Sequence, residues 1–179
     1  MKIGFCGTMS VGKTTLVNAL KEREEFKGYE FATERSKYLR DMGIPLNTDS
    51  TLKGQVIFLA ERCSELYIEN VVTDRTVIDV MAFTNVARSI PYFQADQYKE
   101  LASHMLKEYD YIFYISPEGV PMEDNGVRET NLKFRKKVDR EIKDLLDYYN
   151  HRLRNVTELT GSVEERVEKV IQTVFPQYL

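Results

Sequence analysis

Eight residues near the start of the chain, Gly7 to Thr14, constrain its fold more than any others. They read Gly-Thr-Met-Ser-Val-Gly-Lys-Thr and match the pattern G-x-x-x-x-G-K-[ST]. Glycine at the first and sixth positions lets the backbone turn tightly and approach an anion without a Cβ in the way. The amide groups of such a loop point inward, where the N-terminus of the following helix helps them to bind phosphate. The pattern therefore predicts a phosphate-binding P-loop.

Residues within this loop have separate predicted roles. Lys13 is expected to reach the β- and γ-phosphates of a nucleotide, and the Thr14 hydroxyl is placed to ligate Mg²⁺. The other predicted nucleotide contacts lie in the loop and at the start of the next helix: Gly7, Ser10, Val11, Gly12 and Thr15.

The segments on either side of the loop have the required character. Residues 2–6 are short and apolar enough for a buried strand. Residues 15–22 place Leu16, Val17 and Leu20 on one helical face. Strand, glycine-rich loop and helix is the order in which a P-loop occurs.

The rest of the chain alternates between strand-like and helix-like patterns. Apolar or β-branched runs predict further strands at residues 29–32, 71–74, 111–115 and 154–157. Helical patterns predict helices at about 34–42, 52–67, 76–88, 94–108 and 162–174, with a charged helix ending near residue 150. This alternation predicts an α/β three-layer sandwich, in which helices cover both faces of a mostly parallel five-stranded sheet. No repeat or linker interrupts the pattern, so residues 1–179 are expected to form one domain.

Composition narrows the class of protein further. Hydrophobic residues make up 42% and charged residues 30% of the chain, which suits a packed core and a soluble surface. No apolar run is long enough for a bilayer and no signal peptide is recognisable, so no membrane partner is expected. Cys6 and Cys63 are expected to be buried thiols in a reducing cytoplasm. The net charge of −3 argues against broad electrostatic binding to nucleic acid but leaves a local basic groove open.

Charged residues follow two of the predicted strands, where an open parallel sheet binds its ligands. Glu34 follows the second strand and could take a proton from an acceptor hydroxyl, or it could simply begin a helix. Asp74 ends the third strand and is expected to hold Mg²⁺ or its water. Arg75 could clamp the acceptor or the γ-phosphate; the alternative is a structural Asp–Arg pair. Asp79 and Phe83 are weaker candidates for contacts with substrate.

A polar loop at residues 122–128 predicts a small lid over about residues 120–135. Arg128 and Arg135 are expected to fold over the phosphates of ATP, where they would offset charge in the transition state and exclude water. A solvated charged loop is the alternative.

Taken together, these motifs resemble the nucleoside and nucleotide kinase branch of the P-loop NTPases. The lid pattern Asp-Asn-Gly-Val-Arg at 124–128 is most similar to the small AAA-type kinase domains grouped with nicotinamide riboside kinase, which are abundant in bacteria and bacteriophages. The resemblance covers nearly the whole chain and implies the P-loop NTPase fold. It also implies that Glu34 lies near the acceptor and that Asp74 and Arg75 meet the metal, acceptor and phosphates. Those kinases usually have Glu-Pro where this chain has Glu34-Arg35.

The sequence therefore predicts a phosphotransferase that depends on ATP and Mg²⁺ and moves the γ-phosphoryl group to a nucleoside, nucleotide or related acceptor. A cytoplasmic location in a bacterium or a phage-infected host is expected, and a homodimer is left open. The predicted catalytic residues are Lys13, Glu34, Asp74, Arg75 and Arg128.

Two alternatives remain open at this stage. The first is a phage DNA kinase that phosphorylates 5-hydroxymethylpyrimidine bases, with DNA in a groove lined by Lys133, Lys136, Lys137 and Arg140. The second is a nucleotide-binding switch or regulator. It ranks lower because the chain lacks the Asp-x-x-Gly motif and the guanine-reading Asn-Lys-x-Asp motif of GTP-dependent switches.

Overall fold

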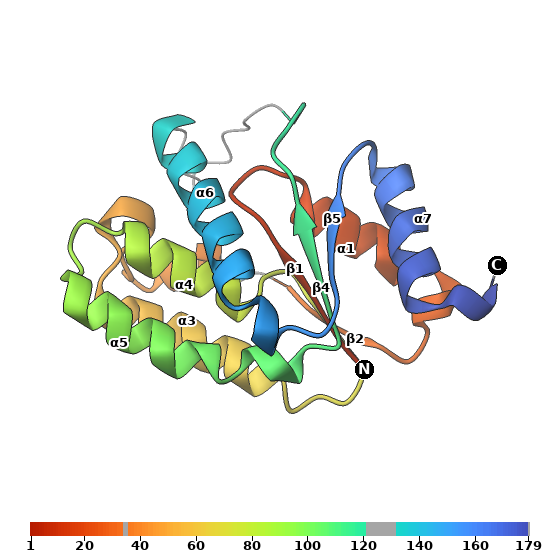
Figure 1. Cartoon of the computed structure of the whole chain (residues 1–179), viewed down its shortest axis with the longest axis horizontal. Helices are drawn as coiled ribbons and strands as arrows, with labels where there is room; N and C mark the ends of the chain where they lie inside the picture. The colour runs from red at the N-terminus through yellow and green to blue at the C-terminus, as the bar shows by residue number, and fades with distance from the viewer. Residues whose placement is uncertain (34–35, 121–131, 179) are drawn as a thin grey trace.

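The computed structural model describes residues 1–33, 36–120 and 132–178. Its strands form one sheet (Figure 1). The strand order is β2-β3-β1-β4-β5. Every pair of neighbouring strands is parallel, which confirms the predicted α/β sheet. The strands are β1 (Lys2–Cys6), β2 (Glu30–Ala32), β3 (Val71–Thr73), β4 (Tyr111–Ile115) and β5 (Val156–Leu159).

Helices connect the strands and follow the last one. Within the described residues the α-helices are α1 (Lys13–Lys21), α2 (Ser36–Asp41), α3 (Leu52–Glu65), α4 (Val77–Val86), α5 (Tyr92–Ser103), α6 (Leu132–Tyr148) and α7 (Val163–Val174). Short 3₁₀ helices occur at Glu24–Phe26, Asn47–Asp49, Leu106–Glu108, Asn150–Arg152 and Pro176–Tyr178. No α-helix in the described ranges combines the length and the apolar character that crossing a bilayer requires.

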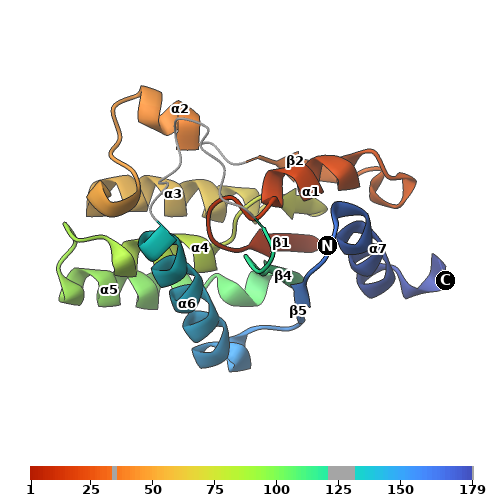
Figure 2. The same ribbon diagram turned by 90° about the horizontal axis from the view of Figure 1, so that it is seen from above.

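The helices form two layers, one on each face of the sheet (Figure 2). Helices α1 and α7 bury Leu16 and Val170 against one face, and α4 and α6 bury Met81 and Ile142 against the other, alongside α3 and α5. The chain steps from β1 to β2 in one direction, but from β2 to β3, β3 to β4 and β4 to β5 in the opposite direction. Because parallel crossovers are right-handed, this reversal puts α1 on the opposite face from the helices of the later crossovers.

The fifth strand and the helix predicted at about 94–108 differ from the structure by a few residues at their ends. Strand β5 lies at Val156–Leu159 rather than 154–157, because it pairs with residues 112–115 of β4, up to Leu159 opposite Ile115. Helix α5 spans Tyr92–Ser103 rather than about 94–108: it begins earlier and ends earlier than expected, and a 3₁₀ helix follows at Leu106–Glu108. Pro91 is the N-cap of α5, a position where the missing N–H of proline removes no helical hydrogen bond.

Helix α4 is buried on nearly all sides, as its apolar sequence predicts. It packs against α3, α5 and α6, and only Asn85 among its residues is not fully buried. Its N-terminus has a capping box, in which the Thr76 hydroxyl and the Asp79 carboxylate satisfy backbone amides at the helix start. Because Thr76 follows closely on the end of β3, this cap fixes the turn that carries Asp74 and Arg75.

Candidate active site

The P-loop connects β1 to α1 through a tight turn that glycine makes possible. Gly12 has a φ of 84° and is the N-cap of α1 in the left-handed conformation. At Gly7, with a φ of 152°, a Cβ would lie 2.8 Å from the carbonyl oxygen of Ile115. Ser10 also adopts a left-handed conformation, with a φ of 56°, which costs a non-glycine residue about 1–2 kcal/mol. Such strain concentrates at functional sites.

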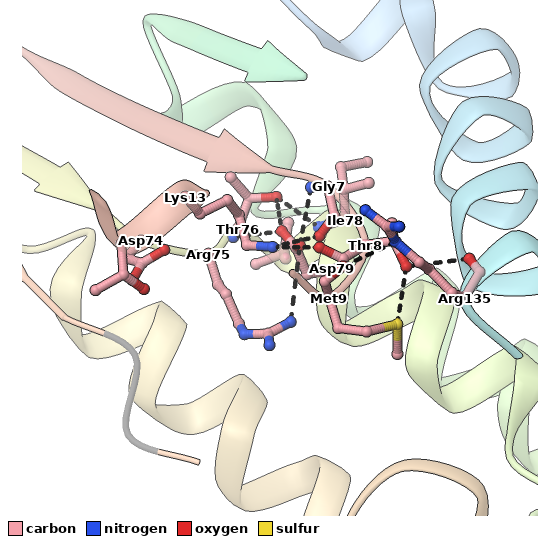
Figure 3. Close-up of polar contacts among 12 residues, drawn as sticks. Gly7, Thr8, Met9, Lys13, Asp74, Arg75, Thr76, Ile78, Asp79 and Arg135 are labelled. Atoms are coloured by element: carbon pink, nitrogen blue, oxygen red, sulfur yellow. Dashed lines mark hydrogen bonds and ion pairs between the residues drawn. The ribbon is translucent and has the colours of Figure 1, made fainter. Parts of the chain in front are cut away.

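The side chain of Lys13 is buried against the loop. Its Nζ donates to the carbonyl oxygens of Gly7, at 2.5 Å, and Thr8, at 2.8 Å (Figure 3). Only 7% of the residue is exposed. The ammonium group is therefore held at the loop, where the sequence predicted that it would meet phosphates.

Thr14 and Asp74 lie together although they are far apart in the sequence. The Thr14 hydroxyl donates to Oδ2 of Asp74 across 2.5 Å. Strand β3 ends next to β1, and this pairing brings Asp74 to the beginning of α1. A hydroxyl and a carboxylate are hard oxygen ligands of the kind that Mg²⁺ prefers, so the donors present fit the predicted metal.

Asp79 is fully buried and holds the turn after β3 against the P-loop. Its Oδ1 accepts from the amide of Gly7 at 3.2 Å, and its Oδ2 accepts from the amide and hydroxyl of Thr76 at 2.8 and 3.0 Å. Nη1 of Arg75 lies 3.9 Å from Oδ1 (Figure 3). With no exposed surface, Asp79 does not reach a substrate, so its contacts are with the protein.

Arg75 and Phe83 lie together in one wall of the site. The guanidinium of Arg75 is 5.1 Å from the ring centroid of Phe83, within the range of a cation–π interaction. Phe83 also packs against Phe134 in the core. It is therefore both a core residue and a residue of the cavity wall.

Two buried arginines contact the outer side of the P-loop. Arg135 of α6 donates to the carbonyl oxygens of Met9 and Ser10, and Arg166 of α7 donates to that of Val11. Burial lowers the pKa of both guanidinium groups, and for Arg135 the charge of Asp139 partly opposes this. The prediction that Arg135 binds ATP stays a prediction.

Arg166 was missed in the sequence analysis, although its position carries a signal. It lies three residues after Val163 and four before Val170, on the apolar stripe of a helix whose other residues there are buried valine and isoleucine. A charged residue at such a position is buried and needs a partner. Here the partner is the P-loop.

A cavity of about 280 Å³ opens beside the P-loop. On one side it is lined by P-loop and strand-end residues: Met9, Ser10, Val11, Gly12, Lys13, Thr14, Asp74 and Arg75. On the other side it is lined by residues at and between α2 and α4: Ser36, Lys37, Leu46, Asn47, Ser50, Gln55, Phe58, Val80 and Phe83. Phosphate-binding groups and a partly aromatic pocket therefore share one cavity.

Some predicted site residues are not in this cavity wall. Gly7 lies at the start of the P-loop, and Thr15 is exposed on α1. Glu34, Arg128 and most of the predicted lid lie outside the described residues.

Residues 2–166 match the model of the AAA domain family. No curated protein matches the chain in sequence. Among solved structures, the chain is similar to deoxyadenosine kinase from M. mycoides with bound dCTP, at a TM-score of 0.66 and 16% identity, over 97% of this chain and 98% of that one. The same kinase with dCMP and dCDP gives a TM-score of 0.73 at 15% identity, with the same coverage.

NadR protein in complex with NR is also similar, with a TM-score of 0.74 and 17% identity over 95% of this chain and 50% of NadR. At these sequence identities, the likeness to the solved structures establishes the fold. The match to the family model covers most of the chain and establishes the family. The chain therefore belongs to the AAA domain family and has the fold of P-loop nucleoside kinases.

Proposed function

We propose that this chain is an ATP- and Mg²⁺-dependent kinase that phosphorylates a small nucleoside, nucleotide or closely related acceptor. The observation that carries the proposal is the shared cavity, in which Lys13, Thr14 and Asp74 face the same space as Gln55 and Phe58. A kinase must hold phosphate donor and acceptor in contact, because phosphoryl transfer depends on positioning and electrostatics.

The donor side of the cavity suits a nucleoside triphosphate. The P-loop amides bind the phosphates, and Lys13 adds a positive charge at the β- and γ-phosphates. The Thr14 hydroxyl and the Asp74 carboxylate would hold Mg²⁺, which when bound would further neutralise the phosphate oxygens. Arg75, whose guanidinium lies near Asp79 and the ring of Phe83, lines the cavity and is our candidate for contact with the transferred group or the acceptor.

The acceptor side suits a planar ring with polar edges. Phe58 and Phe83 offer aromatic surface, and Gln55 offers an amide that can both donate and accept a hydrogen bond. Gln55 is fixed in place, because the Tyr98 hydroxyl donates to its backbone carbonyl at 2.8 Å. A nucleoside base has this combination of flat apolar faces and hydrogen-bonding edges. Glu34 remains our candidate for the base that takes the acceptor proton.

One observation favours a DNA substrate as a second candidate. Lys133, Lys136, Lys137 and Arg140 are exposed on α6, the helix whose Arg135 contacts the P-loop. A basic strip of this kind could bind a DNA backbone. We rank it second, because the net charge is −3 and a small cavity is already present beside the P-loop.

One assay distinguishes the candidates. The protein is incubated with γ-labelled ATP and Mg²⁺ and offered separate panels of nucleosides, nucleotides and duplex DNA that contains 5-hydroxymethylpyrimidine. We expect label on a free nucleoside or nucleotide, loss of that label with Lys13→Ala, and its retention with Lys21→Ala, which removes an exposed lysine of α1. Label only in modified DNA would favour the second candidate. Tight ATP binding without any transfer would favour a switch or regulator.

A further inference from the structure

The outer side of the P-loop is held by two arginines that come from opposite faces of the sheet. Arg135 lies on α6, in the layer formed with α3, α4 and α5, and Arg166 lies on α7, in the layer formed with α1 (Figure 2). Nε of Arg135 donates to the carbonyl oxygen of Met9 across 3.2 Å, and Nη2 donates to the carbonyl oxygen of Ser10 across the same distance. Nη1 of Arg166 lies 2.8 Å from the oxygen of Val11. Three consecutive carbonyl groups of the loop therefore accept from buried guanidinium groups.

Further contacts fix Arg135 in this position. Its Nη1 donates to the carbonyl oxygen of Val120 at 2.9 Å. The Thr8 hydroxyl donates back to the carbonyl oxygen of Arg135 at 3.1 Å (Figure 3). One turn along α6, Asp139 accepts from the hydroxyl of Tyr114 on β4 at 2.7 Å. Helix α6 is thereby tied both to the loop and to the sheet.

Peptide geometry connects these carbonyl groups to the anion site. In a trans peptide the carbonyl of one residue and the amide of the next point in opposite directions. Holding the carbonyls of Met9, Ser10 and Val11 toward the arginines therefore turns the amides of Ser10, Val11 and Gly12 the other way. Those are the residues through which the loop lines the cavity.

The charge of the two arginines adds to this effect. Both are at least nine-tenths buried, with exposed fractions of 7% and 4%. Within residues 1–33, 36–120 and 132–178, neither guanidinium has a carboxylate oxygen within 4 Å. Buried charges are normally paired or bind a ligand. The hydrogen bonds that these two positive charges make to the described residues go to carbonyl oxygens, and such charges favour an anion on the other side of the loop.

We propose that Arg135 and Arg166 are positioning residues that clasp the P-loop by its carbonyl groups and so set its amides for phosphate. We call this arrangement the carbonyl clasp: the hydrogen bonds from Arg135 and Arg166 to the carbonyl groups of Met9, Ser10 and Val11. It rests on one part of the proposed function, namely that the loop binds a nucleotide. It assigns Arg135 a role through the loop rather than a direct contact with the γ-phosphate. Arg166 has the same role from the other helical layer.

A role through the loop and a direct contact with the γ-phosphate predict different losses of affinity for ADP and for an ATP analogue. P-loop amides surround the α- and β-phosphates, so damage to the clasp weakens ADP and a non-hydrolysable ATP analogue by the same factor. Loss of an arginine that contacts the γ-phosphate weakens the ATP analogue alone. Binding of ADP and AMP-PNP to the full chain, measured by calorimetry, separates the two.

Four variants test the clasp. Arg135→Lys keeps the charge but cannot make all three hydrogen bonds, so we expect both nucleotides to bind at least about tenfold more weakly, the scale of one charge-assisted hydrogen bond. Arg166→Met should give a similar loss. Arg166→Lys keeps one donor for the Val11 carbonyl, so the affinity for both nucleotides should fall by about threefold or less. Lys169→Met, which removes an exposed charge from the same helix, should change neither affinity.

The outcomes that contradict the clasp are specific. A loss for AMP-PNP without a loss for ADP would make Arg135 a γ-phosphate ligand. Normal affinity for both nucleotides, with only a lower melting temperature, would reduce both arginines to structural residues. If Arg166→Met does not fold, the paired lysine variants carry the test. A wild-type chain that binds neither nucleotide would overturn the proposed kinase function and the clasp together, whereas wild-type binding with unaffected variants overturns the clasp alone.

Discussion

The buried carboxylate of Asp79 accepts a hydrogen bond from the backbone amide of Gly7 across 3.2 Å. This bond joins the start of the P-loop to the capping box of α4, from which Arg75 also projects. The turn after β1 and the turn after β3 are thus built as one unit. In the proposed kinase, their relative position decides where the donor phosphates lie with respect to the acceptor.

The first prediction concerns this unit. Asp79→Asn leaves one of the buried donors without an acceptor and removes the charge facing Arg75. We expect kcat to fall about tenfold and the free energy of unfolding to drop by about 1–3 kcal/mol, the cost of an unsatisfied buried group. Steady-state kinetics and chemical denaturation measure these effects.

A double-mutant cycle shows whether Asp79 acts through Arg75. If it does, Asp79→Asn should have much less effect on kcat in an Arg75→Ala background. Fully additive effects would contradict the link. Asp96→Asn, on the exposed face of α5, is the matched control and should leave kcat unchanged.

The second prediction concerns the Thr14–Asp74 pair as a magnesium site. Thr14→Val removes the hydroxyl and should raise the Mg²⁺ concentration needed for half-maximal activity, while Thr14→Ser should keep it near the wild-type value. Asp74→Asn should raise it further, because a charged ligand is lost. A Mg²⁺ titration of initial rates makes the comparison. Lower kcat with an unchanged Mg²⁺ requirement in both variants would remove the metal assignment.

The third prediction concerns Lys13. Because its charge is already held at the loop by Gly7 and Thr8, its removal takes away a preorganised electrostatic group. Lys13→Ala should lower turnover by about a hundredfold or more, as the loss of one such group does in other enzymes. Near-normal turnover of the folded variant would refute the role.

The fourth prediction separates acceptor binding from donor binding. Gln55→Leu removes the polar group from the aromatic side of the cavity, so the KM for the acceptor should rise by about tenfold or more while the KM for ATP stays the same. Gln97→Leu, at an exposed position of α5, serves as the control. An equal change in both KM values would place Gln55 in the framework of the site rather than in the acceptor pocket.

The fifth prediction concerns the packing beneath the site. A Cβ at Gly4 would lie 2.4 Å from Cγ2 of Thr76 and 2.8 Å from the ring of Tyr109. Gly4→Ala should therefore destabilise the fold by about 1–3 kcal/mol, which lowers the melting temperature by about 2–4 °C for each kcal/mol. Adding Thr76→Ser removes the clashing methyl group and keeps the capping hydroxyl, so part of the loss should be recovered. Unchanged melting of Gly4→Ala would show that the core relaxes around the extra methyl group.

Much of the framework could be predicted because its signals are local. Alternation of apolar strands with amphipathic helices predicted the parallel sheet, and a carboxylate at the end of β3 predicted that Asp74 would approach the P-loop. The ends of β5 and α5 could not be predicted to the residue. Pairing with β4 sets the ends of β5, and the start of α5 depends on Pro91, which is the N-cap of that helix.

The contacts of several site residues could not be predicted from the spacing of residues in the sequence, because they depend on tertiary packing. Asp79 has the same pattern whether it faces a substrate or the Gly7 amide, and only the packing of α4 against the sheet decides this. Arg135 was expected at the phosphates because it follows the lid pattern, but its hydrogen bonds to Met9, Ser10 and Val120 depend on where α6 docks. For Arg166 the signal existed in the apolar stripe of α7, yet its partner lies more than 150 residues earlier and leaves no trace in the local sequence.

The central position of β1 in the sheet sets the order in which the chain can become active during synthesis. The strand and its loop leave the ribosome before the rest of this sheet, but β1 pairs with residues 71–73 and 111–114, and the loop accepts hydrogen bonds from residues 135 and 166. The P-loop sequence is therefore made early and its anion site is completed late. A nascent chain that stops before α7 has the whole motif but lacks Arg166, so under the proposed clasp we expect it to bind a nucleotide more weakly than a chain that includes α7.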